Sequence, residues 1–173
     1  INAETRDKMD FSLIIPCYNE EGNVAAFFDE AEKVLDLAPI SYEYVFVNDG
    51  SGDQTEAKLR ELFDNHPDKN ITIINFSRNF GKESAIFAGL QNSTGDAICL
   101  IDADLQQLPQ TAYQMYRTLI ANPELDCVCA YQKNRRESKF MSKTKSLYYK
   151  IMNSMVDTEF KNGASDFRVF TSK

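Results

Sequence analysis

Short apolar runs alternate with segments of helical periodicity along this chain, and this alternation constrains its fold more than any other feature. Strands are expected over residues 11–16, 42–48, 71–76, 97–101 and 126–131. Helices are expected from Asn23 to before Pro39, around 59–63 after a cap at Ser51 or Asp53, over 83–90, from Pro109, and over about 142–156. Such alternation predicts one α/β domain, a mostly parallel sheet with helices on both faces.

Polar side chains follow four successive expected strands. They are Asn19 and Glu20, Asp49, Arg78 and Lys82, and the pair Asp102 and Asp104. In a parallel sheet the carboxyl ends of the strands meet at one edge, and ligands bind in the crevice there. We therefore expect these side chains to form one site.

The motif Asp102-Ala-Asp104-Leu-Gln106 directly follows the fourth apolar run. In extended chain, residues two apart point the same way, so the three polar side chains are expected to converge. Their oxygens suit Mg²⁺ or Mn²⁺ and leave positions for substrate phosphates. A plain polar loop is the alternative, and a phosphatase nucleophile is disfavoured because it normally follows a first strand. Glycine-rich phosphate loops are absent, so Arg78 and Lys82 are expected to help the metal hold phosphates.

Charge is unevenly distributed. Residues 1–132 carry 9 basic and 22 acidic residues, whereas residues 133–150 carry seven basic residues against Glu137. The basic residues are Lys133, Arg135, Arg136, Lys139, Lys143, Lys145 and Lys150. This basic segment (residues 133–150) predicts an anion site or contact with acidic lipid head groups, with a solvated helix face as the alternative. Nucleic acid is disfavoured because the rest of the chain would repel it.

The four cysteines have no metal-ligand spacing, and buried, reduced thiols of a cytosolic protein are expected for all of them. No apolar stretch is long enough for a membrane span.

Five stretches together resemble the family 2 glycosyltransferases of GT-A fold. They are F-S-L-I-I-P-C-Y-N-E at 11–20, V-N-D-G-S at 47–51, S-R-N-F-G-K at 77–82, D-A-D-L-Q at 102–106 and S-D-F-R at 165–168. The full set is similar to the branch that transfers sugars to polyprenyl phosphates, which includes dolichyl-phosphate mannose synthases and bactoprenol glucosyltransferases.

The resemblance implies roles for individual residues. Pro16, Tyr18, Glu20 and Asp49 would line the nucleoside pocket, with Asp49 reading the base. Asp102, Asp104 and Gln106 would bind the metal, Mg²⁺ or Mn²⁺. Arg168 would meet the phosphates and Asp166 would lie by the transferred sugar, so Asp104, Asp166 and Arg168 are the candidate catalytic residues. Arg135, Arg136, Lys139 and Lys143 are candidates for the acceptor phosphate.

The chain departs from the family pattern at two places. Gln107-Leu108-Pro109 stands where the family usually has H-P-P or D-P-P, and Ser165 stands where it prefers glycine. Family members also continue beyond D-F-R into interfacial helices and membrane spans. Residues 1–173 are therefore expected to be a catalytic domain separated from its anchor, soluble by itself and placed at the cytoplasmic membrane face in the whole protein.

The expected function is inverting transfer of a hexose from a nucleotide diphosphate sugar to a polyprenyl phosphate. We expect UDP-sugars rather than GDP-sugars as donors, because the motif sequences are more similar to the bacterial glucosyltransferase branch. Two alternatives remain: a soluble enzyme that glycosylates a surface polysaccharide, with Asp166 as base, and a catalytically silent nucleotide-sugar binding domain. The oligomeric state is left open.

Overall fold

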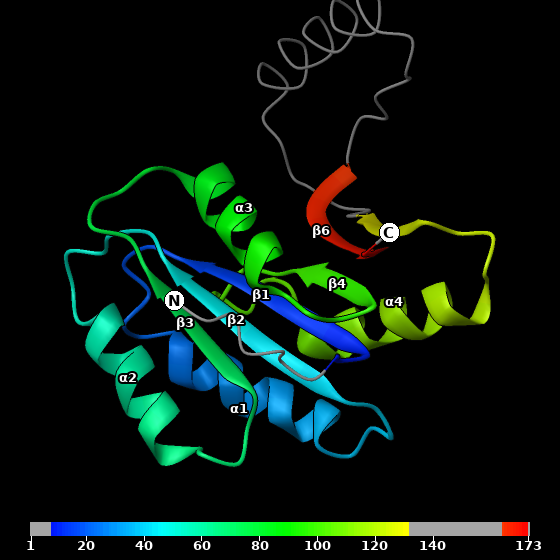
Figure 1. Ribbon diagram of the computed structural model, residues 1–173, viewed down its shortest axis with the longest axis horizontal. Helices are drawn as coiled ribbons and strands as arrows, with labels where there is room; N and C mark the ends of the chain where they lie inside the picture. Colours follow the sequence, from blue (N-terminus) through cyan, green and yellow to red (C-terminus); the bar gives the residue numbers. More distant parts are fainter. Residues whose placement is uncertain (1–7, 132–163, 173) are drawn as a thin grey trace, which may run out of the picture.

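The computed structural model describes residues 8–131 and 164–172, with the backbone alone described at residues 131 and 164–166. In chain order the elements are β1 (Phe11–Cys17), α1 (Val24–Leu35), β2 (Tyr42–Asn48), α2 (Thr55–Asn65), β3 (Ile71–Asn75), α3 (Lys82–Asn92), β4 (Ala97–Leu100), α4 (Pro109–Ala121), β5 (Cys127–Tyr131) and β6 (Ala164–Thr171) (Figure 1). All five expected strands are confirmed, with ends within one residue. The helix expected over 142–156 lies outside the described residues.

The strands form one sheet in the order β3-β2-β1-β4-β6-β5. β1 pairs in parallel with both β2 and β4, and β2 pairs in parallel with β3. β6 is antiparallel to both of its neighbours, β4 and β5. The chain therefore moves outward from β1 to β3 and then returns to place β4 on the other side of β1. Such a reversal opens a crevice at the carboxyl ends of the two central strands.

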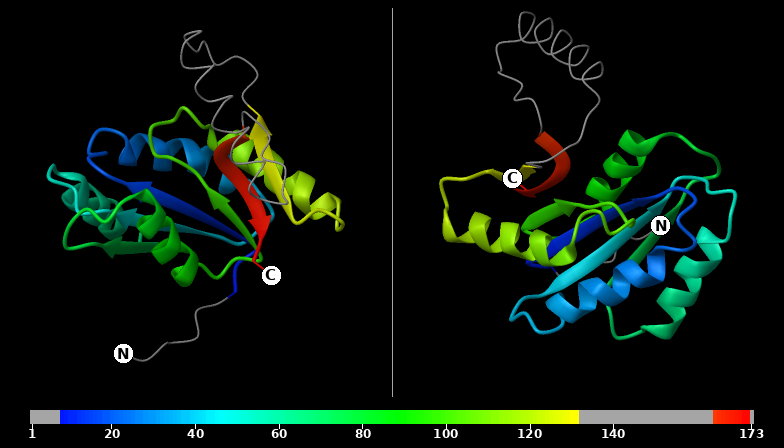
Figure 2. Two further views of the ribbon diagram at one scale, coloured as in Figure 1. Left: turned by 90° about the horizontal axis from the view of Figure 1, so that it is seen from above. Right: turned by 180° about the vertical axis from the view of Figure 1, so that it is seen from behind.

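Helices lie on both faces of the sheet (Figure 2). Side chains of the central strands alternate between two cores, one on each face. Phe11, Leu13 and Ile15 of β1 join the larger core, to which α1, α2 and α4 contribute. Ile14 joins the smaller core beneath α3. Among the described helices, α3 alone covers this second face. The mostly parallel α/β sheet with helices on both faces is thus confirmed.

Sequence spacing accounts for the helices of the larger core. α1 buries Val24, Phe27, Phe28, Ala31 and Leu35, which follow each other at intervals of three or four residues. Each large apolar side chain buried in this way contributes about 1.5–3 kcal/mol. Pro109 occupies the first turn of α4, as expected, because the first helical N–H has no partner to lose there.

Helix α3 packs differently from its apolar pattern. Its buried residues are Ala85 and Gly89, whereas the large side chain of Phe87 is 61% exposed. A Cβ on Gly89 would lie 2.3 Å from Cγ2 of Ile14, so the helix backbone approaches the sheet too closely for larger residues. Small residues therefore set the packed face of this helix.

Strand β6 was not predicted from the sequence. It has no continuous apolar run; Phe167 and Val169 are buried while Arg168 and Phe170 are half-buried. This period-two pattern is typical of an antiparallel strand. β6 brings the S-D-F-R motif into the sheet, where Arg168 pairs in register with Leu100 at the end of β4.

Two of the four cysteines are buried as expected, and the other two are exposed. Cys17 and Cys99 are buried, but Cys127 and Cys129 are exposed on β5, with their sulfurs 3.5 Å apart. The expectation was wrong for this pair because β5 lies at the end of the strand order and is covered less than the central strands. Among the described residues no helix combines the length and apolar character that crossing a membrane requires.

Candidate functional site

A cleft of about 470 Å³ lies at the carboxyl ends of β1, β2 and β4, where the strand order reverses. Its lining residues are Pro16, Cys17, Tyr18, Glu20, Asp49, Asn79, Gly81, Lys82, Ala85, Asp102 and Asp104. Seven of these eleven were expected from the sequence to bind a nucleotide sugar or metal. Residues separated by more than eighty positions in the chain thus meet in one place, as the parallel topology requires.

The β1–α1 and β2–α2 loops are fastened together by reciprocal hydrogen bonds. The backbone N–H of Asn19 donates to Ser51 Oγ at 3.0 Å, and the N–H of Gly52 donates to Asn19 Oδ1 at 2.9 Å. The N–H of Glu20 donates to Thr55 Oγ1 at 2.8 Å. These bonds fix the backbone that presents Tyr18 and Glu20 to the cleft.

Asp49, at the end of β2, holds the loop that carries the S-R-N-F-G-K motif. Its carboxylate is 3% exposed and accepts the N–H groups of Phe80 at 2.7 Å and Gly81 at 2.9 Å. Helix α2 begins at Thr55, so Asp49 does not cap it. Each carboxylate oxygen can accept a second hydrogen bond, so the position remains compatible with contact to a base.

Gly50 lets the same two loops touch. Its φ is +63°, and a Cβ there would lie 2.2 Å from the carbonyl carbon of Arg78. Only glycine avoids both the left-handed strain and this overlap. The V-N-D-G-S motif therefore positions the β3–α3 loop with two adjacent residues, Asp49 by hydrogen bonding and Gly50 by close backbone approach.

Asp102 is paired with Lys82 across the cleft. Lys82 Nζ lies 2.7 Å from Oδ1 and 3.0 Å from Oδ2 of Asp102. The backbone N–H of Asp102 donates to Gln107 Oε1 at 3.2 Å. Gln107, at one of the departures from the family pattern, thus closes the turn that holds Asp102.

The extended geometry expected for residues 102–106 is wrong. β4 ends at Leu100, residues 103–104 turn, and Leu105 has φ +58°. Asp104 is exposed and its Oδ1 accepts the N–H of Gln106 at 3.0 Å, while the Gln106 side chain is exposed and does not line the cleft. The turn, rather than strand alternation, keeps Asp102 and Asp104 together.

The donor set fits a divalent metal only with help from substrate. Among residues 8–131 and 164–172, no three histidine, cysteine or acidic side chains cluster closely enough to hold a metal ion. Asp102 and Asp104 supply hard oxygens, and Mg²⁺ or Mn²⁺ commonly takes one or two carboxylates and completes its coordination with phosphates and water. Two acids in an open cleft match that pattern.

The remaining expected site residues either do not line the cleft or lie outside the described residues. Arg78 is exposed and lies over the Phe80 ring, with Cζ 4.8 Å from the centroid, and it does not line the cleft. Arg168 is half-buried between β4 and β5. The side chain of Asp166 and the residues Arg135, Arg136, Lys139 and Lys143 lie outside what the structure describes.

Cys17 is the one thiol in the lining of the cleft. Burial raises the pKa of this thiol, and the nearby carboxylates of Glu20 and Asp102 raise it further. It is therefore neutral at physiological pH and is not a nucleophile. Asn79 also lines the cleft. It was not singled out from the sequence, although its place inside the S-R-N-F-G-K motif was the signal for it.

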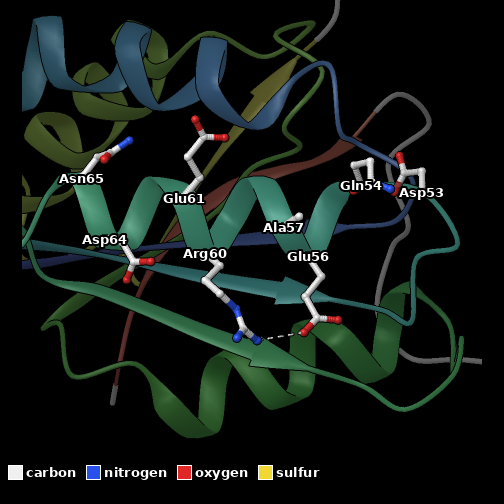
Figure 3. Close-up of a pocket in the computed structure, with 8 residues that line it drawn as sticks. All are labelled: Asp53, Gln54, Glu56, Ala57, Arg60, Glu61, Asp64 and Asn65. Atoms are coloured by element: carbon white, nitrogen blue, oxygen red, sulfur yellow. Dashed lines mark hydrogen bonds and ion pairs between the residues drawn. The ribbon is translucent and has the colours of Figure 1, made fainter.

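A second hollow of about 650 Å³ runs along the outer side of α2 (Figure 3). It is lined by Asp53, Gln54, Glu56, Ala57, Arg60, Glu61, Asp64 and Asn65. Four of these are acidic, and Arg60 is paired with Glu56 at 3.2 Å. The groove is larger than the cleft but would repel phosphate, and it contains no residue expected to be functional.

The sequence profile described as glycosyl transferase family 2 matches residues 12–172. The chain belongs to this family. It is 34% identical over 164 residues to a bactoprenol glucosyl transferase of Shigella phage SfX, an alignment that covers 94% of this chain and 52% of the relative. The chain thus spans about half the length of the curated relatives it matches.

Two solved structures have a similar fold. The mannosyltransferase PcManGT from Pyrobaculum calidifontis, in complex with GDP-Man and Mn²⁺, has a TM-score of 0.64 at 20% identity, over 95% of this chain and 45% of that chain. Glucosyl-3-phosphoglycerate synthase from Mycobacterium tuberculosis, in complex with Mn²⁺, UDP and phosphoglyceric acid, has a TM-score of 0.65 at 17% identity, over 95% of this chain and 56% of that chain. The fold is therefore that of the GT-A glycosyltransferases, as the motifs indicated.

Proposed function

We propose that residues 1–173 form the catalytic domain of an inverting glycosyltransferase that moves a hexose from a UDP-sugar to a polyprenyl phosphate. The observation that carries the proposal is the meeting of Asp49, Lys82, Asp102 and Asp104 in one cleft at the carboxyl ends of the central strands. Family membership and the bactoprenol glucosyl transferase relative support it. The two solved structures described above are complexes with GDP-Man and with UDP, so guanosine is the second nucleotide to test.

The donor would lie along the cleft with its base near Asp49 and Tyr18. A carboxylate can accept hydrogen bonds from a ring N–H of uracil or guanine. Pro16 and Glu20 would line the same nucleoside end, and Lys82 would meet the diphosphate. Arg168 and Arg78 are the further cations assigned to phosphates. Neither side chain lines the cleft. We assign both to the diphosphate end, which Arg168 would approach from β6 and Arg78 from the loop before α3.

Asp102 and Asp104 would hold the divalent metal, with Gln106 as the third proposed ligand. Mn²⁺ complexes among the structural neighbours support a divalent cation, Mg²⁺ or Mn²⁺. When bound, the metal supplies charge stabilisation for the leaving diphosphate. Asp102 and Asp104 line the cleft, whereas Gln106 does not.

The acceptor phosphate needs little help to act as a nucleophile. A phosphate monoester has a second pKa of about 6, so it is largely dianionic at neutral pH. Its oxygen attacks the anomeric carbon, the bond from that carbon to the donor diphosphate breaks, and the electron pair leaves with the nucleotide. The protein's part is to position both phosphates and stabilise the departing charge. Asp166 is assigned a place beside the transferred sugar.

The proposal is tested first by binding and then by turnover. Thermal-shift measurements on the 173-residue chain should show stabilisation by UDP-sugar or GDP-sugar that grows with Mg²⁺ or Mn²⁺, since a ligand selective for the folded state raises its stability. A longer protein that contains this chain should then transfer hexose to polyprenyl phosphate and not to an oligosaccharide. Transfer to the oligosaccharide alone, or no turnover at all, would overturn the proposed acceptor or the proposed activity.

The basic segment is proposed to hold the domain at an anionic membrane surface on the cytoplasmic side. Each Lys or Arg near such a surface contributes about 1 kcal/mol. The chain should therefore co-sediment with anionic vesicles at low salt more than with neutral vesicles. Replacing Arg135, Arg136, Lys139 and Lys143 with Gln should abolish this preference. Unchanged vesicle binding by the quadruple variant would leave the segment as a solvated face.

A further inference from the structure

We propose that Lys82 couples metal binding to nucleotide diphosphate binding, because one ammonium group serves either the Asp102 carboxylate or the diphosphate. This inference rests on the proposed function and concerns how the same cleft is regulated by its own ligands. It assigns Lys82 a second role beyond holding a phosphate: Lys82 opposes binding of the metal by itself and favours binding of the metal together with the nucleotide.

The geometry places Lys82 in competition with any cation on Asp102. Its Nζ contacts both carboxylate oxygens, at 2.7 and 3.0 Å. The Lys82 side chain is 40% exposed and the Asp102 side chain is 33% exposed, so neither is locked in the core. A divalent cation that takes the same carboxylate oxygens must displace this ammonium group or suffer its repulsion at close range.

The position of Lys82 at the start of α3 makes a nearby negative charge more stabilising. It is the first residue of the helix, following Gly81, and the positive end of the helix dipole disfavours a lysine there. The backbone of Gly81 is itself fixed by its hydrogen bond to Asp49 at 2.9 Å. The flexible four-carbon side chain of Lys82 can change its partner without movement of this backbone, and the partner must carry negative charge.

A bound diphosphate provides that alternative partner. Lys82 and Asp102 line the same cleft as Asp49, so a nucleotide that reaches Asp49 places its phosphates within the range of the lysine side chain. Once Lys82 has moved to the phosphates, Asp102 is released for the metal. The effect is reciprocal by linkage: metal that occupies Asp102 also makes Lys82 available to the diphosphate.

The test is a binding cycle with Mn²⁺ and UDP, measured by calorimetry on the 173-residue chain, with GDP as the second nucleotide. Mn²⁺ affinity is measured with and without saturating nucleotide for the parent and for Lys82→Met. Without nucleotide, Lys82→Met should bind Mn²⁺ about tenfold more tightly than the parent does. Saturating nucleotide should increase the Mn²⁺ affinity of both proteins, but the increase in Lys82→Met should be at least about fivefold smaller than the increase in the parent. Lys82→Arg, which keeps the charge, should retain most of the coupling.

The matched control is Lys58→Met, which removes an exposed lysine paired with Glu61 at 2.8 Å on α2, away from the cleft. It should leave both Mn²⁺ affinities unchanged. In an Asp102→Asn background, Lys82→Met should no longer strengthen Mn²⁺ binding, because the shared carboxylate is gone. Urea unfolding midpoints close to the parent's show that each variant is folded.

The two proposals fail in different ways. If neither UDP nor GDP binds the parent chain, the proposed function is wrong, and the coupling falls with it. If nucleotide binds but Lys82→Met shows the parent's Mn²⁺ affinity or the parent's coupling factor, the proposed function stands and this inference is wrong. If Lys58→Met strengthens Mn²⁺ binding as much as Lys82→Met does, the change in net charge explains the effect, and the inference about Lys82 is wrong.

Discussion

The Asp49 carboxylate accepts a hydrogen bond from the backbone N–H of Phe80 at 2.7 Å, across 31 positions of sequence. A second bond, from the N–H of Gly81 at 2.9 Å, completes a two-point clamp between the end of β2 and the start of α3. The acceptor of both bonds is buried, with Asp49 only 3% exposed. A residue expected to contact the base therefore also builds the loop that delivers Lys82 to the diphosphate end of the cleft.

We expect Asp49→Ala to loosen the β3–α3 loop and to destabilise the fold by about 2–3 kcal/mol, since two backbone N–H groups lose a charged acceptor. Urea unfolding measures the loss, and hydrogen exchange should accelerate most at the amides of Phe80 and Gly81. Asp68→Ala, at an exposed position, serves as the control and should change neither. Unchanged exchange at those two amides would contradict the clamp.

The clamp also sharpens the test of base recognition. If Asp49 contacts the base as well as the loop, Asp49→Ala should weaken UDP binding more than pyrophosphate binding. Equal losses for the two ligands would show that Asp49 acts through the loop alone.

Gly50→Ala should destabilise the protein far more than Gly52→Ala, although the two glycines are two positions apart. At Gly50 the alanine meets a φ of +63° and a carbonyl carbon 2.2 Å from its Cβ, whereas at Gly52 nothing lies within 4 Å. Strain and overlap together should cost about 2–5 kcal/mol at Gly50, against less than about 1 kcal/mol at Gly52. Similar unfolding midpoints for the two variants would show that the loops do not need this close approach.

Asp104→Asn should weaken metal-dependent nucleotide binding while leaving the fold intact. The asparagine side-chain oxygen can still accept the N–H of Gln106, which preserves the turn. As a neutral amide, however, it is a poorer ligand for Mg²⁺ or Mn²⁺. Calorimetry should record a loss of about tenfold or more in UDP affinity in the presence of Mn²⁺. Asp29→Asn, an exposed position on α1, is the control, and parent-like affinity in Asp104→Asn would remove Asp104 from the metal site.

Stability should fall at alkaline pH because of two tyrosines that share one carboxylate. The hydroxyls of Tyr42 and Tyr44 donate to Glu32 Oε1 at 3.0 and 2.7 Å. Burial, followed by these hydrogen bonds, raises the pKa of Tyr44 well above its ordinary value and that of Tyr42 to about 12. The unfolded chain then loses these protons first, from about pH 10, so the free energy of unfolding decreases as the pH rises above that value.

Tyr44→Phe should cost about 1–3 kcal/mol at neutral pH, where the hydrogen bond to Glu32 is lost. It should also reduce the alkaline loss, by up to about 1.4 kcal/mol per pH unit for the one group removed. Urea titrations between pH 8 and 11 check both effects. Thr118→Ala, which removes an exposed hydroxyl that does not titrate from α4, is the control and should keep the parent's pH dependence. A parent-like slope in Tyr44→Phe would contradict the assignment.

Much of this protein was determined by local sequence. The five apolar runs predicted the strands to within one residue, and the spacing of residues such as Phe27 and Ala31 predicted where the described helices lie, because burial requires a fixed period in each element. Alternation of the two predicted a parallel sheet, and the parallel sheet predicted that Asp49, Lys82 and Asp102 would meet. These inferences succeed because chain direction alone brings the carboxyl ends of parallel strands together.

The tertiary structure decided what depends on contacts between distant segments. β6 could not be found as an apolar run because Arg168 and Thr171 interrupt its apolar residues, and only its pairing with β4 and β5 makes it a strand. The turn at Leu105 replaced the expected extended chain after β4. Asp49 acquired its loop-holding role, and Asp102 its lysine partner, from backbone and side chains 20 to 32 positions away. Residue type and periodicity can identify candidate site residues in the sequence. Their hydrogen-bond partners, however, depend on the distances between loops, and only the packing of the strands fixes those distances.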